Sequence, residues 1–167
     1  SWTTDPTSVA DAQRLVRVVR EAPDLSSVLD YGCGTGRLAH YFPAHRYLGY
    51  DVSSAMLAVA QREYPGHCFV DRLVSGAQYD VVVCNSVVQY QRGHRLWLDV
   101  LRDVASRAHH TVLIETYDGP NGYAPLVATG GCDTPIVCHP TEKYCAVLSE
   151  YGAVERRLLA SGMYPLK

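Results

Sequence analysis

The sequence lacks any run of apolar residues that approaches the roughly 20 needed to span a membrane. No charged segment followed by an apolar one opens it. We therefore expect no membrane partner and a cytoplasmic location. Lysine is scarce, since only Lys143 and Lys167 accompany the arginines, and no basic block occurs. With a net charge of −2, the chain lacks the basic character typical of nucleic-acid-binding proteins, which disfavours nucleic acid as a partner.

The chain also lacks a CxxC pair, although it holds six cysteines. That absence argues against a disulfide framework and a redox motif, and it favours reduced thiols in an intracellular protein. His109 and His110 stand before a predicted strand, where we expect solvated side chains without a catalytic role. Four further potential ligands fit none of the usual zinc spacings, so the sequence predicts no metal: Cys132, Cys138, His139 and Cys145.

Strands and helices alternate through most of the chain. Apolar segments predict strands at 27–31, 46–51, 67–71, 79–85 and 111–116. Helical periodicity predicts helices at 7–21, at about 36–41, after an N-cap at Ser53, and at 93–107. The segments 79–85 and 111–116 are apolar without alternation, which is typical of parallel strands buried on both faces. The sequence therefore predicts an α/β fold with a doubly wound, mostly parallel sheet and helices on both faces.

Residues 1–167 are predicted to form one domain in three parts: an N-terminal helix or lid at 1–26, a ligand-binding core at 27–116, and a late loop with C-terminal elements at 117–167. Glycine and proline in 118–135 predict a long loop. A helix at 141–151 and a strand at 153–159 follow, which leaves room only for a shortened strand pair at the C-terminus.

The stretch "VLDYGCGTG" places three glycines directly after the first predicted strand: Gly32, Gly34 and Gly36. Such a turn lies at the carboxyl end of a parallel sheet, and glycine lets the backbone approach a ligand closely. Asp51, about 20 residues on, is placed to bind ribose hydroxyls, so the turn predicts a nucleoside-containing ligand. A dinucleotide fingerprint would need glycine where Arg37 stands, and no G-K-[ST] follows to complete a P-loop.

Four segments resemble, in order and spacing, the motifs of class I S-adenosylmethionine-dependent methyltransferases: "VLDYGCGTG", "YLGYDVSSAML", "FVDRL" and "YDVVVCNSVVQY". The resemblance implies S-adenosylmethionine as cofactor and S-adenosylhomocysteine as product. The first motif would face the methionine half, Asp51 would hold the ribose, and Asp71 would meet the adenine amino group. The residues that the resemblance places at the cofactor are Asp30, Tyr31, Gly32, Cys33, Gly34, Gly36, Asp51, Val52, Met56, Asp71, Asn85 and Ser86.

Within this family, "NSVVQY" resembles the small-molecule methyltransferases and lacks the Asn-Pro-Pro-aromatic form of many nucleobase or glutamine methyltransferases. The resemblance thus implies in-line methyl transfer to a nitrogen or oxygen of a small-molecule acceptor. No general base is assigned, and the candidates are Tyr90, Glu115 and Tyr117, with His94 and Gln89 nearby. Trp2 is a candidate to close over the cofactor.

Several alternatives stay open at this point. Asp30 either contacts the cofactor or hydrogen-bonds backbone amides to orient the glycine turn. Asp51, Asp71 and Asn85 have simpler readings as a helix cap or as turn residues. An RNA or protein methyltransferase, and a cofactor-binding module without catalysis, remain alternatives to the small-molecule enzyme. The oligomeric state is not set by the sequence, with a dimer as one possibility.

Overall fold

A computed structural model gives the structure of the chain and describes residues 6–21, 25–91, 96–116, 122–124 and 136–154. The chain divides into two compact units, Ser1–Asn85 with Val104–Glu115, and Ser86–Asp103 with Thr116–Lys167. The first unit holds the main sheet, and the second holds a smaller one. Among the described helices, none is long and apolar enough to cross a membrane.

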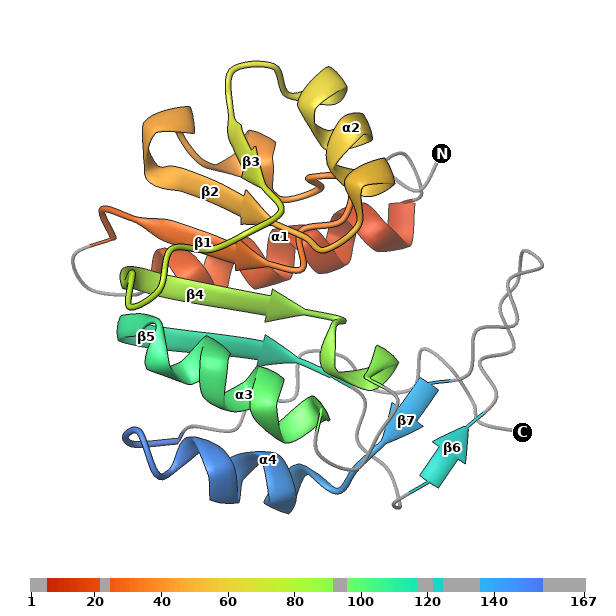
Figure 1. The fold of residues 1–167 in the computed structure, drawn as a ribbon, viewed down its shortest axis with the longest axis vertical. Helices are drawn as coiled ribbons and strands as arrows, with labels where there is room; N and C mark the ends of the chain where they lie inside the picture. The colour runs from red at the N-terminus through yellow and green to blue at the C-terminus, as the bar shows by residue number, and fades with distance from the viewer. Residues whose placement is uncertain (1–5, 22–24, 92–95, 117–121, 125–135, 155–167) are drawn as a thin grey trace. The chain divides into compact units, whose positions relative to one another are not determined.

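The main sheet has five parallel strands in the order β3-β2-β1-β4-β5 (Figure 1). Their bounds are Val28–Tyr31 for β1, Tyr47–Tyr50 for β2, Cys68–Val70 for β3, Tyr79–Asn85 for β4 and Ala108–Glu115 for β5. This arrangement confirms the predicted α/β fold with a parallel sheet. The chain runs outward from β1 to β3 and then returns to β4 on the other side of β1, which creates the point where ligands bind in such sheets.

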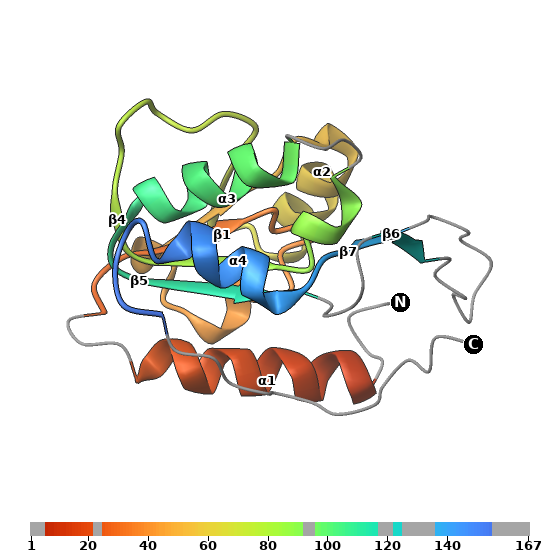
Figure 2. The same cartoon turned by 90° about the horizontal axis from the view of Figure 1, so that it is seen from below.

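Helix α1 (Pro6–Arg20) packs its apolar stripe on one face of this sheet (Figure 2). Proline at the first helical position loses no hydrogen bond, and its fixed φ suits the helix. The stripe follows the i, i+3, i+4, i+7 pattern of an amphipathic helix and consists of Ala12, Leu15, Val16 and Val19, all buried. It joins Val28, Val81, Val83 and Leu113 of the strands in one apolar core.

The predicted helix at 36–41 is wrong. Only a single 3-10 turn, η1 (Ala39–Tyr41), forms there, and a second, η2 (Ala44–Arg46), follows. Gly36 has a φ of 78°, outside the helical region, and Pro43 ends the segment seven residues later. Because a residue before proline is also kept out of the helical region, too few residues remain for an α-helix.

The other predicted helices form close to their expected bounds. Helix α2 (Ser54–Glu63) begins after Ser53, whose hydroxyl accepts a hydrogen bond from the Met56 amide at 3.4 Å as the predicted N-cap. Helix α3 covers Leu96–Ser106 and α4 covers Thr141–Leu148. The 3-10 turn η3 (Val88–Tyr90) follows β4.

The second unit contains a small antiparallel sheet that the sequence did not predict. Strand β6 (Gly122–Ala124) pairs with β7 (Ile136–Cys138), so part of the expected loop at 118–135 is extended and paired. Three-residue strands carry too little periodicity to be found by pattern. The strand predicted at 153–159 does not include 153 and 154, and its remaining residues lie outside the described ranges.

A buried carboxyl group lies beneath the end of β1. Asp30 is 3% exposed, and its Oδ2 accepts a hydrogen bond of 2.6 Å from the Tyr47 hydroxyl. Burial raises the pKa of Asp30 to about 6, although the Tyr47 hydrogen bond and the Arg37 charge lower it. Burial, followed by the charge of Asp30, raises the pKa of Tyr47 well above its usual range. The partner of Asp30 is therefore the Tyr47 hydroxyl. The sequence had left two other partners open for Asp30, the backbone amides of the glycine turn and the cofactor.

This raised pKa gives the stability of the fold a distinct pH dependence. The folded state binds the Asp30 proton more tightly than the unfolded chain, whose pKa is near 3.8. The resulting stabilisation is fully present below that value and is lost as pH rises through about 6. We expect Asp30→Asn to stabilise the protein more at about pH 7.5 than at about pH 5, with the two effects differing by about 1 kcal/mol.

Urea unfolding at the two pH values measures this difference. Asp71→Asn, which removes an exposed carboxylate at the end of β3, is the matched control and should show no such change. An Asp30→Asn effect that is equal at both pH values would contradict the buried, protonated carboxyl.

Candidate functional site

The glycine turn after β1 has a backbone that only glycine adopts readily. Gly32, Gly34 and Gly36 have φ values of 77°, 55° and 78°. Side chains on L-residues are strained in this left-handed region. The turn lies at the carboxyl end of β1, beside the reversal of strand order.

Hydrogen bonds from β2 and the residue that follows it hold the turn. The Tyr50 carbonyl accepts bonds from the amides of Gly32 and Cys33, at 2.7 and 2.9 Å. One Asp51 carboxylate oxygen, Oδ2, accepts a bond of 2.8 Å from the Gly34 amide, and Oδ1 accepts one of 2.8 Å from the Ser53 amide. Asp51 therefore joins the glycine turn to the start of α2.

The two sides of the turn differ in the space around them. A Cβ on Gly36 would lie 3.0 Å from the Phe69 ring, and one on Gly49 would lie 2.5 Å from it. A Cβ on Gly34 would meet nothing within 4 Å. The turn is thus packed on the Phe69 ring on one side, and above Gly34 it leaves room for a ligand.

The side chain of Cys33 lies under the turn and is buried. Its Sγ would be 2.9 Å from a Cβ on Gly49. Burial, and next the charges of Asp30 and Asp51, raise the pKa of this thiol above its usual range. Cys84 in β4 is fully buried, and burial raises its pKa in the same way. Both thiols are therefore neutral, and contact between Cys33 and a ligand would come from its backbone.

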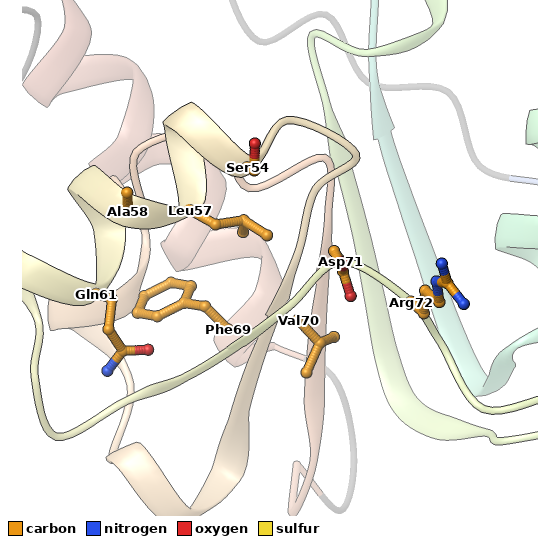
Figure 3. A pocket seen from close by; sticks show the side chains of 8 residues that line it. All are labelled: Ser54, Leu57, Ala58, Gln61, Phe69, Val70, Asp71 and Arg72. Atoms are coloured by element: carbon orange, nitrogen blue, oxygen red, sulfur yellow. The ribbon is translucent and has the colours of Figure 1, made fainter.

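A pocket of about 510 Å³ lies between α2 and β3 (Figure 3). Leu57 and Phe69 supply apolar walls, while Asp71 and Arg72 stand at the end where β3 finishes. Ser54, at the first turn of α2, and the apolar Val70 and Ala58 also line it, with Gln61. The structure thus places Asp71 at a pocket beside the carboxyl end of the sheet.

Of the residues predicted at the cofactor, Asp71 alone lines this pocket. Val52 is 81% exposed and Met56 is 46% exposed. Tyr31 is buried, with its ring 4.8 Å from that of Tyr50. Contacts of these residues with a cofactor stay predictions.

The carboxyl end of β4 carries polar groups with few partners. Asn85 pairs in register with Glu115 of β5, and the buried Oδ1 of Asn85 has no hydrogen-bond partner. Ser86 has a φ of 57°, a strained value for a residue with a side chain. In the second unit, Gln89 is fully buried, and neither atom of its amide is hydrogen-bonded.

The candidate bases are placed to different degrees. Tyr90, in η3, is 43% exposed. Glu115 ends β5, but only its backbone is described. Three predictions lie outside the described residues: Tyr117, His94 and Trp2.

The residues of the turn fit a nucleoside cofactor. Each Asp51 oxygen accepts one backbone bond and keeps a lone pair, which is the acceptor capacity that two ribose hydroxyls require. The space above Gly34 leaves the backbone open to the amino-acid portion. Sequence reasoning missed the supporting Tyr47 and Phe69, although Gly49 inside a strand is the usual sign of such a close approach.

Comparisons with known proteins agree with this geometry. Residues 29–109 match the family model described as a methyltransferase domain. The trans-aconitate 2-methyltransferase of Acidovorax sp. (strain JS42) is 34% identical over 88 residues, which are 48% of this chain and 33% of that protein. The match thus spans about a third of the length of this curated relative.

Solved structures resemble the whole fold. The magnesium protoporphyrin IX methyltransferase of Synechocystis PCC 6803, with bound S-adenosylmethionine, has a TM-score of 0.68 at 19% identity, over 98% of this chain and 80% of that one. An amino pentose methyltransferase from Micromonospora echinaspora, also with S-adenosylmethionine bound, has a TM-score of 0.64 at 20% identity, over 85% and 81% of the two chains. At these identities the likeness establishes the fold.

The glycine turn, the carboxylate after β2, the strand order and the family match agree with one another. Residues 29–109 are thus similar to a methyltransferase domain, and the fold is that of solved methyltransferases with bound S-adenosylmethionine.

Proposed function

We propose that this protein transfers a methyl group from S-adenosylmethionine to a nitrogen or oxygen of a small-molecule acceptor. The observation that carries the proposal is the glycine turn, which Asp51 holds in place and which is open above Gly34. This is a backbone surface that a ligand can approach without meeting side chains. It lies where the strand order reverses.

Each part of the cofactor has a proposed partner. Asp51 accepts hydrogen bonds from the two ribose hydroxyls, since each of its oxygens retains a lone pair. The backbone of Gly32–Gly36 faces the methionine portion. Asp71, at one end of the pocket between α2 and β3, accepts a hydrogen bond from the adenine amino group. Asp30, two residues before the turn, is buried and accepts a hydrogen bond from the Tyr47 hydroxyl, so it has no proposed contact with the cofactor.

The bound cofactor supplies a methyl group on a cationic sulfonium, so the chemical reactivity is its own. The protein has to align the acceptor with that methyl and exclude water. Asn85 and Ser86, at the end of β4, are proposed to lie near the reactive end. If the acceptor loses a proton, the candidate bases are Tyr90, Glu115 and Tyr117.

A small-molecule acceptor agrees with the named acceptors of the similar proteins: trans-aconitate, an amino pentose and magnesium protoporphyrin IX. The net charge of −2 and the two lysines give no electrostatic support for a nucleic-acid substrate. We also propose a cytoplasmic location, in which cysteines such as the described ones, which form no disulfide with one another, are usual.

Methyl transfer itself tests the proposal. Purified protein is incubated with methyl-labelled S-adenosylmethionine and a panel of amino sugars, carboxylic acids and hydroxylated aromatics. We expect acceptor-dependent formation of S-adenosylhomocysteine and a product heavier by one methylene. Methylation of RNA or protein alone would contradict the small-molecule acceptor. Tight cofactor binding without transfer to any class would contradict the enzyme and favour a cofactor-binding module.

The space above Gly34 yields a prediction about cofactor affinity. Gly34 and Gly76 both have a positive φ and no atom within 4 Å of an added Cβ. Alanine at either position thus carries a similar backbone strain of about 1 kcal/mol. We expect Gly34→Ala to weaken S-adenosylhomocysteine binding at least tenfold in calorimetry, because its methyl enters the space proposed for the ligand. Equal affinities in folded Gly34→Ala and Gly76→Ala would place the cofactor elsewhere.

The buried amide of Gln89 yields a second prediction. A polar group buried without a hydrogen bond costs about 1–3 kcal/mol of stability. Gln89→Met, which removes the unpaired amide, should therefore raise the free energy of unfolding by about 1 kcal/mol in urea unfolding. Gln13→Met, at an exposed residue of α1, is the control and should leave the free energy of unfolding unchanged. A destabilised Gln89→Met would contradict a buried amide without hydrogen bonds.

A further inference from the structure

At the amino-terminal end of β4 and β5, a shift in the pairing of the two strands brings three potential metal ligands together. Tyr79 of β4 pairs with Ala108 of β5, but the next pair joins Val81 to Thr111. One residue of β4, Asp80, therefore stands opposite two residues of β5, His109 and His110. This is a β-bulge, which takes side chains out of strict alternation and often serves to aim them.

The side chains of Asp80, His109 and His110 point toward one another at this bulge. The two imidazole rings lie 4.3 Å apart between centroids, and His109 Nδ1 is 3.0 Å from His110 Nε2. His110 Nε2 is 3.9 Å from Asp80 Oδ1. One nitrogen or oxygen from each of the three residues falls within 4.8 Å of the others.

Asp80 is fixed for this role by the segment before β1. Its Oδ2 accepts hydrogen bonds from the amide and hydroxyl of Ser27, at 2.8 and 2.9 Å, and from the amide and hydroxyl of Ser26. These bonds to Ser26 and Ser27 lower the pKa of Asp80 to about 2. Four hydrogen bonds thus end on one oxygen, and the other oxygen faces the histidines.

We propose that Asp80, His109 and His110 form a binding site for Zn²⁺. Two imidazole nitrogens and one carboxylate oxygen are ligands that zinc prefers, and a water would complete a tetrahedral set. Zinc bonds of 2.0–2.1 Å place neighbouring ligand atoms roughly 3.3 Å apart, close to the 3.0 Å between the two histidine nitrogens. Binding the ion would also bring His110 Nε2 closer to Asp80 Oδ1 than the present 3.9 Å.

The place of this site in the fold indicates a structural ion. It joins the amino-terminal ends of β4 and β5 to the segment before β1. The glycine turn lies at the opposite, carboxyl-terminal end of the strands. Along β4, Asp80 and Asn85 are five residues apart, which corresponds to roughly 16 Å. The ion would therefore stabilise the amino-terminal end of these strands without contacting the proposed methyl-transfer site. The sequence predicted no metal, because the usual zinc spacings do not describe ligands that a bulge brings together.

Calorimetry with Zn²⁺ tests the proposal on the untagged chain after treatment with a chelator. We expect one ion per chain and a higher thermal unfolding midpoint, which chelator returns to its starting value. His109→Ala and His110→Ala should each weaken Zn²⁺ binding at least tenfold. His45→Ala, an exposed histidine outside the cluster, is the matched control and should bind as the wild type does.

Cysteine thiols are the competing ligands, so Co²⁺ serves as a spectroscopic probe. A visible spectrum without a thiolate charge-transfer band supports the histidine and carboxylate site. A thiolate band, or unchanged Zn²⁺ affinity in the two histidine variants, would overturn it. S-adenosylhomocysteine binding should be the same in the His109→Ala/His110→Ala double variant, which verifies the fold and separates this test from that of the proposed function.

Discussion

The glycine turn of this protein depends on one carboxylate, which accepts hydrogen bonds from two backbone amides. Asp51 accepts bonds from Gly34 and Ser53, so the glycine turn and the start of α2 keep a fixed separation. The Tyr50 carbonyl holds the preceding part of the turn, and the Phe69 ring fills the space that Gly36 and Gly49 leave free. A turn built this way needs no ligand to keep its shape. Preorganisation of that kind lowers the entropy lost when a cofactor binds.

Much of this arrangement is predictable from the sequence, because strong local patterns determine it. The strand Tyr79–Asn85 forms at its predicted bounds, since its apolar residues at 81–84 do not alternate with polar ones, which is typical of a parallel strand buried on both faces. The glycine spacing and a carboxylate about 20 residues later are likewise a local pattern, which predicts a nucleoside-containing ligand. The N-cap at Ser53 follows from local chemistry in the same way.

Features that arise from tertiary contacts were not predictable. The bond between Asp30 and Tyr47 joins residues 17 apart, and nothing in the spacing of the two marks them as partners. The helix expected after Gly36 fails for a local reason instead, because Pro43 follows too soon for an α-helix to form. Strand β5 begins at Ala108, before the predicted 111, because the bulge opposite Asp80 lets two histidines extend it. A bulge is a property of a strand pair, so a single segment does not reveal it.

We propose above all that the glycine turn at Gly32–Gly36, together with the Asp51 carboxylate, binds S-adenosylmethionine. A crystal structure of the complex with S-adenosylhomocysteine tests it most directly. We expect both ribose hydroxyls within hydrogen-bond distance of Asp51 and the amino-acid portion over Gly34. Density for the nucleoside elsewhere on the chain, or a turn that rearranges and covers Gly34 when the ligand binds, would contradict it.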